Sequence, residues 1–73
     1  MIKQFKKGLI KEFDRLKNYH LEFKETDDMF KIRVSTPYKM KVYPLNLTEN
    51  EFLLNNRSIT PEELFKDFTR GEK

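Results

Sequence analysis

Between residues 21 and 42, apolar and polar positions alternate one for one, and most of the polar positions carry a positive charge. Successive side chains of a β-strand point to opposite faces of its sheet, so this pattern predicts strands with one apolar and one polar face. We expect three antiparallel strands, at residues 20–25, 30–35 and 39–43. Residues 26–29 and a turn built on Pro37 connect them.

A single register satisfies both faces of the first two strands, because it pairs apolar with apolar residues and an acid with a base. Its pairs are Phe23–Ile32, Leu21–Val34 and Glu22–Arg33. For the second and third strands, the same reasoning predicts the pairs Val34–Met40 and Ile32–Val42. The third strand is expected to stop before Pro44, which has no N–H to donate to a ladder.

Residues 2–18 have the pattern of an amphipathic helix. Apolar residues recur every three or four positions and form one stripe, namely Ile2, Phe5, Leu9, Phe13 and Leu16. Gly8 lies away from this stripe and would let another backbone approach the helix closely.

Residues 45–60 allow two interpretations. Thr48 and Glu51 have the spacing of a capping box, which favours a short helix. Asn55 and Asn56 lie between two short apolar stretches and tolerate positive φ, which favours a hairpin or turn. We favour the extended form, and leave the short helix open for residues 48–60.

The last element is a helix at about residues 61–69. Thr60 is its N-cap, Pro61 occupies the first helical position, and Glu63 can close a capping box. The chain thus begins with a helix, continues with three strands and the ambiguous residues 45–60, and ends with a second helix. This order predicts one α+β domain over residues 1–73. In it, the two helices would cover the apolar face of the sheet as a second layer.

Composition narrows the class of protein. The chain has 73 residues and no cysteine, so disulfides are excluded and a zinc site of the Cys/His type is not expected. No apolar stretch is long enough to span a membrane, and no apolar segment of a signal peptide follows the basic N-terminus. We therefore expect a cytoplasmic protein without membrane insertion.

The sequence shows no catalytic constellation. His20 is the only histidine, and we expect it to cap the first helix; Asp27 and Asp28 are read as turn formers rather than metal ligands. Gly8 and Gly71 are the only glycines, so a phosphate-binding loop is not expected. We expect no enzyme, no cofactor and no metal.

Two surfaces are candidates for binding. The polar sheet face would gather cations and an aromatic ring suited to nucleic acid, namely Lys24, Lys31, Arg33, Lys39, Lys41 and Tyr43. The first helix would present an apolar anchor among lysines for an acidic protein, namely Lys3, Lys6, Ile10 and Lys17. The acidic final third of the chain weakens the nucleic-acid interpretation.

We therefore expect a small, non-enzymatic regulatory module that binds a protein partner, with nucleic-acid binding as the alternative. A homodimer is a further option, because self-association would stabilise so small a domain. A compact chain rich in lysine and asparagine is typical of proteins that bacterial mobile elements and phages encode.

Overall fold

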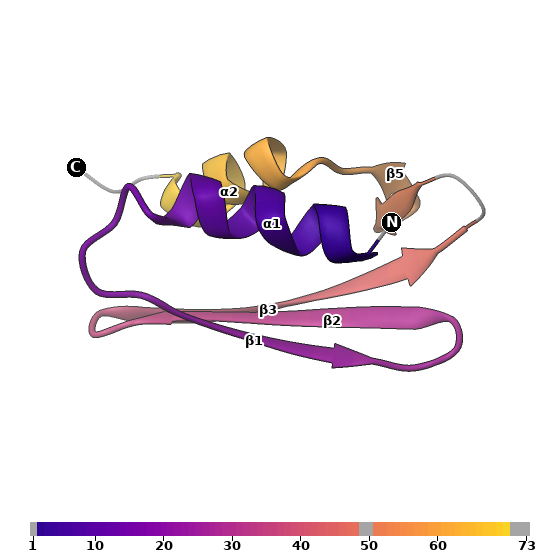
Figure 1. Cartoon of the computed structure of the whole chain (residues 1–73), viewed down its shortest axis with the longest axis horizontal. Coiled ribbons are helices and arrows are strands. Elements are labelled where there is room, and N and C mark those ends of the chain that lie inside the picture. The colour runs from indigo at the N-terminus through magenta and orange to yellow at the C-terminus, as the bar shows by residue number, and fades with distance from the viewer. Residues whose placement is uncertain (1, 49–50, 71–73) are drawn as a thin grey trace. The chain divides into compact units, whose positions relative to one another are not determined.

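The fold is known from a computed structural model that describes residues 2–48 and 51–70. In these residues, one helix precedes five strands and a second helix follows them (Figure 1). The elements are α1 (Ile2–Phe13), β1 (His20–Glu25), β2 (Met29–Thr36), β3 (Lys39–Leu47), β4 (Phe52–Leu54), β5 (Arg57–Ser58) and α2 (Pro61–Thr69). The predicted α+β class is confirmed, with five strands in place of three.

The strands form one antiparallel sheet in sequence order, β1-β2-β3-β4-β5. The register of β1 and β2 is confirmed, because Phe23 pairs with Ile32 and Glu22 pairs with Arg33. The bounds predicted for β1 are also correct. Local alternation and one acid–base pair were sufficient to determine how these two strands align.

The register predicted for β2 and β3 is wrong by one residue. Val34 pairs with Lys41 instead of Met40, and Ile32 pairs with Tyr43 instead of Val42. A shift of one residue moves every side chain of a strand to the other face of the sheet. The two faces of β3 are therefore the reverse of those predicted.

The cause of the shift is the length of β3 and the turn before it. Thr36 pairs with Lys39, so the turn holds only two residues, and the Thr36 hydroxyl accepts the Tyr38 N–H at 3.3 Å. β3 then continues past residue 43 and buries Tyr43 and Leu45, which are 1% and 0% exposed. These two large side chains occupy the buried face of β3, where the shorter predicted strand would have placed Met40 and Val42.

Pro44 does not end β3 as predicted, but pairs with Lys31 within the strand. In the part of the chain that the structure describes, β4 pairs with β3 at Asn46 and Leu47 alone. Pro44 therefore lies where β3 has a neighbouring strand on one side alone, and there a missing N–H is tolerated.

Within the ambiguous residues 45–60, residues 52–58 form a hairpin rather than a helix, and β4 and β5 are its strands. Asn55 and Asn56 have φ of 54° and 66°, as a two-residue turn of the primed type requires. The Glu51 N–H donates to the Thr48 hydroxyl at 3.1 Å, but Glu51 leads into β4 rather than a helix. Part of the alternative short helix, residues 49–50, lies outside the described residues.

α1 ends at Phe13, five residues before its predicted end at residue 18. Beyond it, the N–H of Arg15 donates to Glu12 at 3.3 Å and that of Leu16 donates to Phe13 at 2.9 Å. Bonds to the residue three positions earlier tighten the last turn of a helix and end it.

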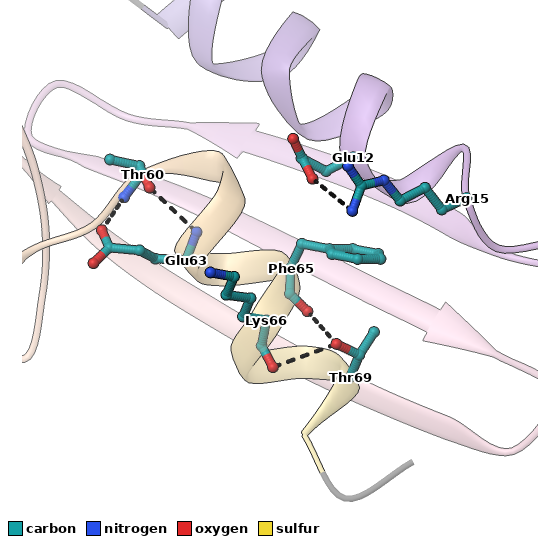
Figure 2. A network of polar contacts seen from close by, with 7 residues as sticks. All are labelled: Glu12, Arg15, Thr60, Glu63, Phe65, Lys66 and Thr69. Atoms are coloured by element: carbon teal, nitrogen blue, oxygen red, sulfur yellow. Dashed lines mark hydrogen bonds and ion pairs between the residues drawn. The ribbon is translucent and has the colours of Figure 1, made fainter. Parts of the chain in front are cut away.

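α2 begins and ends as predicted. The Glu63 N–H donates to the Thr60 hydroxyl at 3.2 Å, and the Thr60 N–H donates to the Glu63 carboxylate at 2.9 Å (Figure 2). This is the predicted capping box. At the other end, the Thr69 hydroxyl donates to the Phe65 carbonyl at 2.9 Å.

α1 and α2 pack against each other through aromatic rings. The ring of Phe13 meets those of Phe65 and Phe68 edge to face, at centroid distances of 4.9 and 5.6 Å. Arg15 lies 5.8 Å from the Phe65 ring and 3.7 Å from the Glu12 carboxylate (Figure 2). Near the start of α2, Gly8 approaches Pro61 closely.

Buried apolar side chains occur in both parts of the chain. In the helix pair they are Phe5, Leu9, Phe13, Leu64, Phe65 and Phe68. In the sheet they are Phe30, Ile32, Val34, Tyr43, Leu45 and Phe52. The two-layer packing of helices on sheet and the single domain stay predictions of the sequence.

Candidate binding surface on the sheet

One face of β1, β2 and β3 is exposed, and we call it the open face. Antiparallel pairing aligns its side chains in rows that cross the three strands. The rows are His20–Ser35–Met40, Glu22–Arg33–Val42 and Lys24–Lys31–Pro44. Each row has a polar or charged residue on β1 and β2 and an apolar residue on β3.

The apolar residues on β3 are unusually accessible. Met40 is 57% exposed and Val42 is 45% exposed, and Tyr38, in the turn that leads into β3, is 96% exposed. Of the large hydrophobic residues exposed in the described part of the chain, only Ile10 lies outside this hairpin. Exposed apolar residues that lie together beside polar ones are typical of an interaction site.

The middle of the open face is locally neutral. The Glu22 carboxylate contacts Arg33 Nε at 3.3 Å and His20 Nε2 at 3.4 Å. All three side chains are more than half exposed, so these contacts add little to stability. Their effect is to hold the Arg33 charge against an acid of the same chain.

Next to this neutral group, two lysines lie directly opposite each other. Lys24 of β1 pairs with Lys31 of β2, and both side chains are exposed. Neither lysine has an acidic group within ion-pair distance in the described part of the chain. Like charges directly opposite destabilise a sheet by roughly 0.2–1 kcal/mol, so this pair is a local cost to the fold.

An open hollow of about 580 Å³ lies across the three strands. Its lining residues are Glu22, Phe23, Lys24, Lys31, Arg33 and Val42. Small-molecule sites have similar volumes, but they enclose most of the ligand, whereas this hollow is open. Four of its lining residues are charged, namely Glu22, Lys24, Lys31 and Arg33.

The six residues predicted for nucleic-acid binding do not share a face. Lys24, Lys31 and Arg33 lie on the open face, as expected. Because of the shifted register, Lys39, Lys41 and Tyr43 point to the opposite face. Tyr43 is buried, and the Lys41 ammonium lies 5.0 Å from its ring centre, so this ring cannot stack on a base.

The second predicted surface is partly assembled. Lys3, Lys6 and Ile10 lie on α1, where their spacing places them on one stripe. Ile10 is 44% exposed, and Lys3 is exposed. Lys17 follows the end of α1 and is not part of that helical stripe. His20 likewise begins β1 and does not cap α1, contrary to expectation.

Met40 and Val42 were missed as surface residues. The sequence contains a competing alternation at Tyr43, Leu45 and Leu47, with three larger apolar residues. Had the strand been continued through Pro44, this pattern would have predicted the observed faces. The assumption that proline ends a strand removed that signal.

Within residues 2–48 and 51–70, no cluster of three or more His, Asp or Glu side chains is arranged to hold a metal ion. In the same residues, no helix has the length and apolar character needed to cross a bilayer. Comparison with protein-family models, curated proteins and solved structures gave no match.

Proposed function

We propose that this chain is a small intracellular binding module, not an enzyme, that docks an acidic protein surface on its open face. One observation carries the proposal: exposed Val42 lines the same hollow as the Lys24–Lys31 pair, which has no acid opposite it. The surface thus combines an apolar anchor with uncompensated positive charge.

Each part of this surface has a separate role in binding. Full burial of a Val or Met side chain is worth about 1.5–3 kcal/mol, and about half of that remains available where the side chain is half exposed. A partner carboxylate between Lys24 and Lys31 would attract both ammonium groups and relieve their repulsion. The charges favour encounter with an acidic surface, and the apolar residues then slow dissociation.

A protein partner is better supported than nucleic acid. Proteins that bind single strands combine a cationic groove with aromatic rings for base stacking. Here Glu22 partly neutralises the cations, and Tyr43 is buried. Tyr38 is exposed, but it lies in the turn after Thr36. Thr36 is five strand residues from Lys31, so about 17 Å at 3.4 Å per residue separate this end of the strand from the lysine pair.

Matched substitutions test which surface binds. Val42→Thr keeps a β-branched residue on the sheet, and Ile10→Gln keeps a good helix former on α1. Val42 and Ile10 are equally exposed, at 45% and 44%. The partner would be recovered by crosslinking in the cells of origin, purified, and titrated against each variant.

We expect Val42→Thr and Lys31→Glu each to weaken binding of the purified partner, with about tenfold loss for the charge reversal. Ile10→Gln and Lys7→Glu, the latter an exposed charge reversal on α1, should leave the affinity unchanged. The opposite result, with loss only for the α1 variants, would move the site from the sheet to α1.

Nucleic-acid binding is tested directly with labelled single-stranded and duplex oligonucleotides between about 50 and 200 mM salt. Binding through phosphates would lose affinity steeply over this range. Tight, salt-sensitive binding that Lys31→Glu removes would overturn the proposal of a protein partner. We expect no such binding.

A further inference from the structure

β1 is one of the two edge strands of the sheet, and among the described residues it pairs only with β2. All six of its residues are in register with β2, and the strand contains no proline and no bulge. A regular edge strand of this length is a template for another strand, unless charges on it repel the newcomer. The charges of β1 therefore decide which strand it accepts.

The charges on the open face of β1 are of opposite sign and symmetric about Phe23. Glu22 and Lys24 lie on either side of that residue and point to the same face of the sheet. In an antiparallel pair of two such strands centred on Phe23, Glu22 of each copy faces Lys24 of the other. An edge strand with lysines alone would repel its own copy, whereas β1 attracts it.

Other registers are less favourable. Centring the pair on Glu22 places two carboxylates opposite each other, and centring it on Lys24 places two ammonium groups opposite each other. A register centred between two residues places the apolar face of one copy beside the polar face of the other. A register centred on Leu21 is also compatible, since Glu22 then faces His20, but it pairs only residues 20–22 of each β1. The register centred on Phe23 pairs residues 21–25 and sets Leu21 opposite Glu25, so it gives the longest ladder with opposite charges facing each other.

We infer that a second copy of this chain pairs with β1, edge to edge and antiparallel, in the register centred on Phe23. The two sheets then form one continuous sheet with a twofold axis at Phe23. Two ion pairs between Glu22 and Lys24 cross the interface. This inference does not depend on the proposed protein partner.

The surroundings of β1 favour this pairing. Glu22 of the second copy brings a carboxylate to Lys24, which otherwise faces only Lys31, so the repulsion within each sheet is relieved. Phe23 is half buried and its ring stacks on Phe30 at 5.6 Å, with an interplanar angle of 15°. In the dimer this ring also faces Phe23 of the second copy, which buries more of its surface.

Charge reversals measured by sedimentation equilibrium test the register. Lys24→Glu should stabilise the monomer, because the introduced carboxylate faces Lys31 within the sheet. At the interface, however, it places Glu22 of one copy opposite the introduced glutamate of the other, at both positions. We expect the dimer dissociation constant to rise about tenfold or more, while the melting temperature of the dilute monomer does not fall.

Exchanging both charges is the matched control. The double variant Glu22→Lys with Lys24→Glu again places opposite charges across the interface. Within each sheet it keeps one attractive and one repulsive pair, with Arg33 and Lys31 exchanged in role. We expect its dissociation constant to return to within about threefold of the natural chain.

Engineered cysteines give an independent measurement, because the natural chain has none. Phe23→Cys places two thiols directly opposite each other, at a spacing that a disulfide can bridge. Leu21→Cys, on the same face of β1, places them about 14 Å apart along the strands. Oxidation should link Phe23→Cys chains into dimers and leave Leu21→Cys chains as monomers.

The inference would be overturned by a natural chain that stays monomeric up to about 1 mM, by equal crosslinking of the two cysteine variants, or by a charge exchange that does not restore the dimer that Lys24→Glu removes. Loss of dimer with a lower melting temperature for Lys24→Glu would also contradict it, since that substitution removes a repulsion within the sheet.

Discussion

Replacing Gly8 by alanine should destabilise the helix pair, although alanine is the better helix former. Gly8 lies in the middle of α1, where alanine would gain about 1 kcal/mol from helix propensity alone. A methyl group at this position would lie 2.8 Å from Cγ and 3.1 Å from Cβ of Pro61. Both distances are shorter than a normal contact between carbon atoms.

Pro61 cannot easily move away. It is the first residue of α2, its ring is rigid, and the capping box at Thr60 and Glu63 holds the backbone on either side. Overpacking of this kind costs about 1–3 kcal/mol. Subtracting the gain in propensity leaves a net loss of about 1 kcal/mol, or roughly 4–8 °C in melting temperature for a domain of this size.

The assay is a double-mutant cycle followed by urea and thermal unfolding at one low protein concentration. Pro61→Ala removes Cγ and leaves one contact at the Cβ position, so Gly8→Ala should be neutral or stabilising in that background. Gln4→Ala, at an exposed position of α1, is the control and should change stability by only a few tenths of a kcal/mol. If Gly8→Ala raises stability by about 1 kcal/mol in the natural background, the close approach is refuted.

Other substitutions test the local devices of the fold by urea unfolding. Asn56→Gly should be neutral or stabilise the chain, because glycine adopts φ of 66° without strain, whereas Asn56→Val should cost about 1–2 kcal/mol; equal effects would contradict this explanation of the turn. Thr60→Ala should cost about 1 kcal/mol, and Thr60→Ser should retain most of the capping energy; an equal loss for both would count against the hydroxyl. Phe13→Ala should lower the free energy of unfolding by about 3–5 kcal/mol, because this fully buried ring contacts both Phe65 and Phe68. Most molecules should then be unfolded at about 25 °C. A variant that stays folded would show that these rings do not hold the helix pair together.

The elements that local signals specify were predictable. α2 is bounded by a capping box and a proline at its first position, both within about four residues of sequence. The alignment of β1 with β2 follows from alternation and one acid–base pair. In both cases the residues that decide the structure are close in sequence or directly opposite each other, so few alternatives compete.

The alignment of β3 was not predictable by the same reasoning, because its sequence contains two apolar alternations of opposite phase. Met40 and Val42 belong to one, and Tyr43 and Leu45 belong to the other. The choice between them depends on which set buries more surface across the whole strand, and the larger set is buried. The early end of α1 was not predictable either, because Leu16 continues the apolar stripe although the helix ends at Phe13.

This one-residue shift also determines which residues the proposed binding surface contains. The predicted alignment would place Lys39, Lys41 and Tyr43 beside Lys31 and Arg33, as a cationic face with a ring for base stacking. The observed alignment moves those three residues to the other face and replaces them by Met40, Val42 and Pro44. A cationic strip beside exposed apolar residues matches an acidic protein surface better than a nucleic-acid backbone. The case for a protein partner therefore depends on the length of one two-residue turn, because a turn longer by one residue would restore the cationic face.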